Sequence, residues 1–134
     1  MENFHDGVIH TKRIKQVIKF EDLKFGNMYP TDIDGCIEYK DKAVIFLEYK
    51  LKDFNMPVGQ KLCLERLTDA IRESGREAVA LLCEHNVFDV NAPVEAGKAI
   101  VKSIYYNSKW HDADGQSVRQ YVERFIKYID RREK

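Results

Sequence analysis

The chain has 134 residues, of which 44% are hydrophobic and 33% are charged, and this composition excludes an intrinsically disordered protein. Its 22 basic and 22 acidic residues balance, so no overall positive field attracts nucleic acid, and any such contact depends on local patches. No window of the sequence is long and apolar enough to predict a membrane span. We therefore expect a single globular domain over residues 1–134, with no membrane partner.

The cysteines and the N-terminal residues predict the cellular compartment. Cys36, Cys63 and Cys83 are an odd number without CxxC spacing, which favours reduced and buried thiols over disulfides. The first ten residues, MENFHDGVIH, lack the apolar core of a signal peptide. Both observations predict a cytoplasmic protein.

The first half of the chain predicts a helix followed by two strands. The helix is expected to begin at its N-cap, Thr11, and to end near Phe25, before Gly26 and Asn27. Residues 33–40 and 43–51 predict strands joined by a tight turn over residues 40–42. The apolar side of the helix is expected to consist of Ile14, Val17, Ile18 and Leu23.

The second half predicts a helix, two strands and a final helix. Residues 57–74 predict a helix that stops at Gly75, with Leu64, Leu67 and Ile71 on one stripe. Residues 77–83 predict a strand covered on both faces, and residues 98–106 a further strand. Ser117 is expected to cap a last helix. Its apolar stripe is Val118, Tyr121, Val122, Phe125 and Ile129.

This order of elements, αββαββα, predicts an α/β fold, a three-layer sandwich with a mixed central sheet flanked by helices. Within it, the register of the first two strands decides which side chains meet. The turn residues Asp41 and Lys42 offer no glycine for a two-residue hairpin, so a three-residue loop is expected. Asp34 then lies opposite Glu48, on one face with Lys50 at the rim of the core. The other face is expected to carry Ile33, Ile37, Ile45 and Leu47.

Two carboxylates that converge at a strand end suggest a metal site. Unpaired like charges are costly there, and a hard divalent cation with oxygen ligands removes the cost. A neighbouring lysine can activate water or stabilise charge on a phosphate. The alternative is that Glu48 and Lys50 form a solvated strand end and that Asp34 is only a turn residue.

The spacing of these residues resembles the PD-(D/E)XK nuclease superfamily, whose core is the restriction-endonuclease fold. Asp34 is followed, after 13 intervening residues, by Glu48-Tyr49-Lys50, and Pro30 and Asp32 lie upstream. Gln60, which opens the next helix in PVGQKLCLERL, resembles the extra motif of the exonuclease-type and virus-type replication-repair branches. The resemblance, including the order of the elements, covers residues 11–84.

The resemblance implies a role for each matching residue. Asp34 and Glu48 would be metal ligands, the Tyr49 carbonyl a further ligand, and Lys50 the catalytic lysine. Gln60 would orient Lys50 or contact DNA, which makes Asp34, Glu48, Lys50 and Gln60 the expected catalytic residues.

Two further acidic residues, Asp32 and Glu21, are additional candidates for the metal site. The proline-aspartate pair is not adjacent to Asp34, so Asp32 is a rival ligand, although Asp34-Gly35-Cys36-Ile37-Glu38 follows the family pattern of an acid, two residues and then apolar-acid. Some relatives carry another acid on the first helix, for which Glu21 is the candidate, against the interpretation of a surface acid.

By this resemblance we expect a metal-dependent nuclease that hydrolyses phosphodiester bonds of DNA with Mg²⁺ or Mn²⁺. A short chain with no separate specificity module predicts recognition of DNA structure or ends, or help from a partner or a second copy in a homo-oligomer. The alternative is a catalytically inactive nuclease-fold module that binds nucleic acid or a protein. A third interpretation is an α/β protein whose motif is accidental.

Overall fold

The computed structural model describes residues 16–132, and the chain divides into two units after Pro30. The described part of the first unit contains a 3-10 helix, η2 (Glu21–Leu23), and a turn at Gly26 closed by backbone hydrogen bonds between Phe25 and Met28. Gly26 has a positive φ of 64°, which the turn requires and which glycine adopts without strain.

The helix predicted from Thr11 to Phe25 is wrong for the described residues, because residues 16–20 have no regular structure and only η2 is helical. Thr11 and Ile14 lie outside the described residues. Val17 and Ile18 are largely exposed, so these two members of the expected apolar stripe are not packed. A short amphipathic helix is marginal in water unless such a face is buried, which explains why the periodicity did not produce a helix here.

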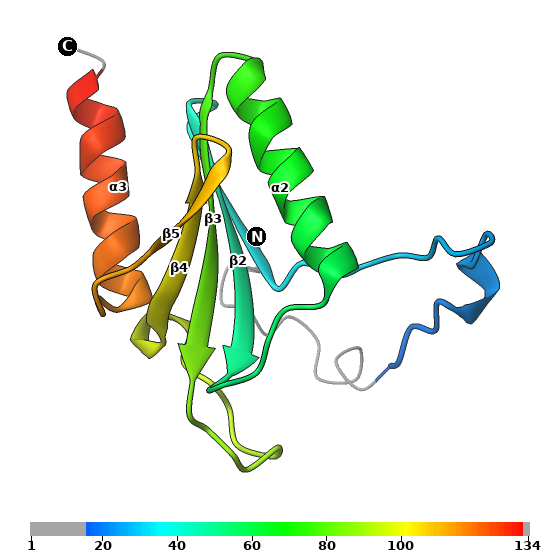
Figure 1. The fold of residues 1–134 in the computed structure, drawn as a ribbon. Coiled ribbons are helices and arrows are strands. Elements are labelled where there is room, and N and C mark those ends of the chain that lie inside the picture. The colour runs from blue at the N-terminus through cyan, green and yellow to red at the C-terminus, as the bar shows by residue number, and fades with distance from the viewer. Residues whose placement is uncertain (1–15, 133–134) are drawn as a thin grey trace, which may run out of the picture. The chain divides into compact units, whose positions relative to one another are not determined.

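The second unit is an α/β structure built on a five-stranded mixed sheet with strand order β1-β2-β3-β4-β5. The β2 and β3 strands run parallel, as their arrowheads in Figure 1 show, and the other neighbours are antiparallel. The β2–β3 crossover contains α2, and α3 follows the sheet. The elements are β1 (Gly35–Tyr39), β2 (Ala43–Leu51), α2 (Val58–Glu73), β3 (Glu77–His85), the 3-10 helix η3 (Ala96–Lys98), β4 (Ile100–Tyr106), β5 (Lys109–Asp112) and α3 (Val118–Arg132).

The hairpin register agrees with the prediction from the turn. Gly35 pairs with Leu47 and Tyr39 with Ala43, so residues 40–42 form the three-residue loop. Lys40 and Asp41 have positive φ angles of 52° and 61°, a turn conformation that tolerates residues other than glycine at a cost.

The helices cover opposite faces of the sheet, α2 on one and α3 on the other (Figure 1). Because side chains alternate along a strand, odd-numbered residues of β2 and β3 face α3 and even-numbered residues face α2. The α3 side buries Ile45, Leu47, Val79, Leu81, Cys83, Phe125 and Ile129, among others. The α2 side buries Phe46, Leu64, Ala80 and Tyr105. Ile33, expected with Ile37, Ile45 and Leu47, packs instead on the α2 side, since it precedes β1 and the strand alternation does not reach it.

The buried side of α2 is rotated from the predicted stripe. Its buried residues are Gln60, Leu64 and Thr68, which are spaced four apart, and Leu67 is 39% exposed. The prediction is therefore correct for Leu64 and wrong for Leu67. Gly75, with a φ of 99°, follows the helix and ends it as expected.

These two leucines give a matched test of the core. Leu64 is 1% exposed, so Leu64→Ala is expected to lower the free energy of unfolding by about 2–5 kcal/mol through lost burial and a residual cavity. Leu67→Ala, on the exposed side of the same helix, should cost less than about 1 kcal/mol. Urea unfolding followed by circular dichroism measures both, and equal costs would contradict the assigned orientation of α2.

The C-terminal half adds one strand that the sequence did not predict. The β5 strand is only four residues long and pairs with β4 through a two-residue turn at Asn107 and Ser108, both with positive φ. Asn-Ser lacks the glycine that identifies such turns in a sequence. The predicted cap of α3 is confirmed: Gln120 N donates to Ser117 Oγ, and Ser117 N donates to Gln120 Oε1, a reciprocal capping box.

The remaining expectations on burial and membranes have simple outcomes. Cys83 is buried as expected, Cys63 is half-buried, and Cys36 is exposed. Within residues 16–132, neither α-helix combines the length and the apolar character that crossing a bilayer requires.

Candidate functional site

The predicted site residues meet where β1 begins and β2 approaches its end. Asp34 directly precedes β1, and its backbone N donates to Glu48 Oε1 over 3.4 Å. Its side chain continues the β1–β2 hydrogen bonding in place of a backbone carbonyl, because Tyr49 N donates to Asp34 Oδ2 over 2.8 Å. Asp34 is thus held against β2 by both its backbone and one carboxylate oxygen. Among the described residues, no hydrogen bond engages its other oxygen, Oδ1.

Glu48 is the buried acid of the site. It lies on the α2 side of β2 and is 1% exposed, although the sequence placed it at the rim of the core. Its Oε2 accepts a hydrogen bond from Gln60 Nε2 over 2.7 Å and lies 3.3 Å from the Lys50 ammonium nitrogen. A carboxylate this deeply buried keeps its charge only with such partners.

The charge of Glu48 is nevertheless costly. Burial raises the pKa of its carboxyl above the ordinary value, and the negative charge of Asp34 raises it further. Lys50 and the Asp34 N–H act in the opposite direction without cancelling the rise. The pair of carboxylates therefore favours the binding of a proton or of a metal cation.

Gln60 contacts two of the other candidates, because its position in the first turn of α2 directs its amide at the end of β2. Besides Glu48, its Nε2 approaches the Asp32 carbonyl at 3.2 Å and Asp32 Oδ1 at 3.4 Å. Its own Oε1 is buried without a hydrogen-bond partner among the described residues. Asp32, the rival of Asp34 in the sequence, therefore lies beside Gln60, and Asp34 is the acid that directly contacts Glu48 and Tyr49.

The Tyr49 carbonyl has a favourable direction for a ligand. In an extended strand the N–H and C=O of one residue point to the same side. Since Tyr49 N points at Asp34, its carbonyl also faces the side on which Asp34 lies. The Tyr49 side chain is on the opposite face, where its hydroxyl donates to the Ala96 carbonyl over 3.1 Å.

Two charged residues beside the site were missed by the sequence reasoning. Glu84 is the register partner of Lys50 in the parallel neighbour strand, and its Oε2 lies 3.5 Å from the ammonium nitrogen of Lys102. The signal was present, since Glu84 follows an apolar strand as Glu48 does. Glu84 also lines a cavity of about 450 Å³ together with Lys52, Glu95 and Lys98, so open space adjoins the cluster, and Lys98 is paired there with Glu95 at 3.2 Å.

The last two sequence predictions concern the acid Glu21 and the binding of a metal ion. Glu21 lies in η2 of the first unit, and the other candidate residues lie in the second unit. Within residues 16–132, no group of three or more Asp, Glu, His or Cys side chains is arranged to hold a metal. The oxygen groups of the site are the carboxylates of Asp34 and Glu48, and the Tyr49 carbonyl is directed to the side of β2 on which Asp34 lies.

A comparison of the chain with protein-family models, with curated proteins and with solved structures finds no match. The residues of the site and their geometry therefore carry the functional argument.

Proposed function

We propose that this protein is a metal-dependent nuclease of the PD-(D/E)XK type that hydrolyses phosphodiester bonds in DNA. One observation carries the proposal: Asp34, Glu48, Lys50 and Gln60 converge at one end of β2, with the acid of the motif buried and its lysine beside it. A structural role explains this poorly, because a buried carboxylate with a raised pKa destabilises the folded protein.

The donor set suits Mg²⁺ or Mn²⁺. Asp34, Glu48 and the Tyr49 carbonyl would hold the ion, which prefers oxygen ligands and fills its remaining positions with water. When bound, such an ion supplies Lewis-acid polarisation of the phosphate and lowers the pKa of a coordinated water. Gln60 keeps Glu48 oriented, since its amide donates to the carboxylate oxygen Oε2.

Lys50 is the positively charged side chain of the site. Its side chain is 24% exposed, so the ammonium reaches solvent while it stays 3.3 Å from Glu48 Oε2. From this position it can orient an attacking water or stabilise negative charge that develops on a phosphate oxygen. Lys52, which lines the adjoining cavity, provides further positive charge for a phosphate backbone, whereas Lys98 is paired with Glu95 and Lys102 with Glu84.

The topology of the second unit also supports the proposal. An antiparallel hairpin, a crossover helix and a parallel strand follow one another in residues 35–85, in the order expected for the catalytic part of the superfamily core. The first helix of that core has no counterpart among the described residues.

Metal binding tests the proposal first. Mn²⁺ or Mg²⁺ at about 100 times its dissociation constant should stabilise the wild-type protein by about 2.7 kcal/mol, because the ion binds the folded state. Asp34→Asn should lose most of this stabilisation. Asp112→Asn, in the exposed strand β5, is the matched control and should keep it.

Titration calorimetry measures the binding of Mn²⁺ and of Mg²⁺, and thermal unfolding with each ion measures the stabilisation. An equal stabilisation of wild type and Asp34→Asn would place the metal elsewhere. A wild type that binds neither ion would favour the catalytically inactive module that binds nucleic acid or a protein.

A further inference from the structure

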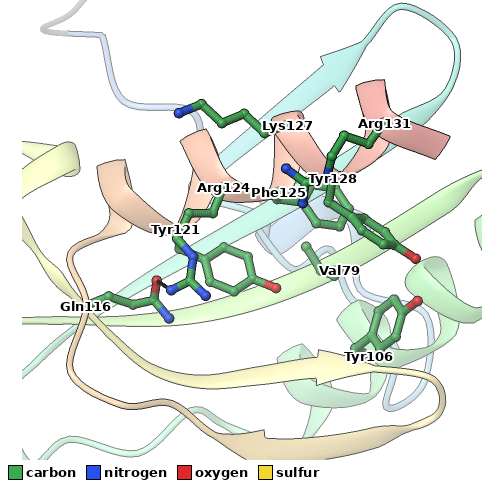
Figure 2. Close-up of a pocket in the computed structure, with 9 residues that line it drawn as sticks. All are labelled: Val79, Tyr106, Gln116, Tyr121, Arg124, Phe125, Lys127, Tyr128 and Arg131. Carbon is green, nitrogen blue, oxygen red and sulfur yellow. Dashed lines mark hydrogen bonds between the residues drawn. The ribbon is translucent and has the colours of Figure 1, made fainter. Parts of the chain in front are cut away.

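A second cavity lies on the face of the sheet opposite the candidate nuclease site. Its volume is about 600 Å³, and it opens between α3 and the end of β4. Figure 2 shows its side chains, with the rings of Tyr106, Tyr121 and Tyr128 extending from β4 and α3 around Val79. The lining residues with charge are Arg124, Lys127 and Arg131.

The sequence of α3 produces two parallel rows of side chains at this cavity. Tyr121, Phe125 and Tyr128 form an aromatic row, with ring centroids of successive members 6.3 Å apart. Arg124 and Arg131 follow Tyr121 and Tyr128 by three positions, which on an α-helix is a rotation of about 60° between side chains, and Lys127 follows Arg124 by the same interval. A row of positive charge therefore runs beside a row of rings.

The basic row lacks its own counterions. The two acids of α3 are engaged elsewhere: Asp130 accepts from the Tyr39 hydroxyl over 2.6 Å, and Glu123 pairs with Arg119 at 3.7 Å. Arg124 donates to the neutral Gln116 Oε1 over 2.8 Å. In the part of the chain that the structure describes, no carboxylate forms an ion pair with a member of the basic row (Arg124, Lys127 and Arg131).

One carboxylate approaches the cavity, at the Tyr106 end. Glu77 Oε1 lies 3.4 Å from the Tyr106 hydroxyl, but it is neutralised by ion pairs with Arg72 and Arg132. One carboxylate against two arginines leaves that end positive as well, so positive charge extends along the whole cavity. An anionic group would bind at the basic row, where no carboxylate of the described residues forms an ion pair.

The tyrosines provide ring surface rather than charge. Burial raises the pKa of Tyr121 to about 12, so its phenol is neutral at physiological pH. Tyr128 is 39% exposed, and the guanidinium of Arg132 lies over its ring, 5.6 Å from the centroid. Aromatic rings of this kind stack with nucleobases, at about 1–3 kcal/mol per base, and basic side chains beside them bind the phosphates.

We propose that this cavity binds a nucleotide unit, with the base against the rings of Tyr121 and Tyr128 and the phosphate at the basic row. The ligand chemistry is a phosphate next to an accessible base, supplied either by a free mononucleotide or by a single strand. A duplex fits poorly, because its bases are stacked inside. The site is independent of the nuclease proposal, since it lies on the α3 side of the sheet.

Fluorescence anisotropy with a labelled thymidine oligonucleotide of about ten residues tests the proposal. Chelator is present throughout, so cleavage does not contribute. We expect the wild type to bind the oligonucleotide, and Lys127→Gln and Arg131→Gln each to weaken binding about fivefold. Each substitution should also reduce the slope of the logarithm of the binding constant against the logarithm of the salt concentration by nearly one, because one phosphate contact is lost. Arg66→Gln removes an exposed charge from α2, on the other face of the sheet, and is expected to leave binding unchanged.

The ring contribution is tested separately at Tyr128, whose exposure makes misfolding of its variants a small concern. Tyr128→Leu should weaken binding, whereas Tyr128→Phe, which keeps the ring, should not. Competition by thymidine monophosphate identifies a mononucleotide pocket, and competition by unlabelled oligonucleotide alone identifies a single-strand site. Both outcomes support the proposal.

Three results would overturn it: no binding of the oligonucleotide, equal loss in Arg66→Gln and Lys127→Gln, or binding of duplex as tight as that of the single strand. Asp34→Asn serves to separate the two sites. It should bind the oligonucleotide as wild type does, so failure of the nuclease proposal leaves this result unchanged.

Discussion

Replacing Lys50 with alanine is expected to reduce metal-dependent cleavage of DNA by about 100-fold or more while the protein stays folded and binds metal. The loss is large because the ammonium is fixed beside Glu48 and would act on charge that develops only in the transition state. It should therefore appear mainly in kcat and little in the affinity for DNA. The assay is run near pH 8, because removal of Lys50 raises the pKa of Glu48 further.

Lys109→Ala is the matched control, since Lys109 is an exposed strand lysine in β5, away from the site. It should cleave like wild type. A Lys50→Ala protein that cleaves DNA at the wild-type rate would refute the role of Lys50, regardless of how this variant binds metal.

Glu48→Gln is expected to abolish metal binding and cleavage together, and at the same time to stabilise the metal-free protein. The pKa of Glu48 is raised by burial and by Asp34, so ionising it costs more in the folded than in the unfolded state. This cost grows as the pH rises from the ordinary glutamate value through the raised one, and it disappears below both. Glutamine carries no charge and keeps an oxygen that can accept from Gln60.

Thermal unfolding in chelator from pH 4 to pH 8 measures this effect. The melting temperature of Glu48→Gln should exceed that of wild type at pH 8, and the difference should narrow toward pH 4. Glu73→Gln, at the exposed end of α2, provides the control and should show no such trend. A Glu48→Gln protein that is less stable than wild type at pH 8 would indicate that the carboxylate is there for stability.

The hairpin could be predicted from the sequence because a local rule determined it. The absence of glycine at Asp41 and Lys42 indicated a three-residue loop, and that loop alone sets which residues of β1 and β2 are opposite. The neighbourhood of Asp34 and Glu48 follows directly from this register.

The burial of Glu48 could not be predicted in the same way. It depends on Gln60 and the rest of α2 covering the end of β2, which is a tertiary contact between segments twelve residues apart. Glu84 was missed for a related reason, because only the parallel pairing of β2 and β3 places it beside Lys50.

The two errors in secondary structure have different causes. Val17 and Ile18 have helical periodicity, but periodicity does not show whether a surface is available to bury them. The strand β5 has four residues, KWHD, which is too short for an alternating pattern to identify.

The central claim is that this site hydrolyses phosphodiester bonds, and a cleavage assay of the wild-type protein tests it most directly. Labelled single-stranded, duplex and branched DNA are each incubated with Mn²⁺, with Mg²⁺ and with chelator. We expect cleavage of at least one substrate that requires the metal, with Mn²⁺ at least as effective as Mg²⁺. No metal-dependent cleavage of any of the three substrates would contradict the account.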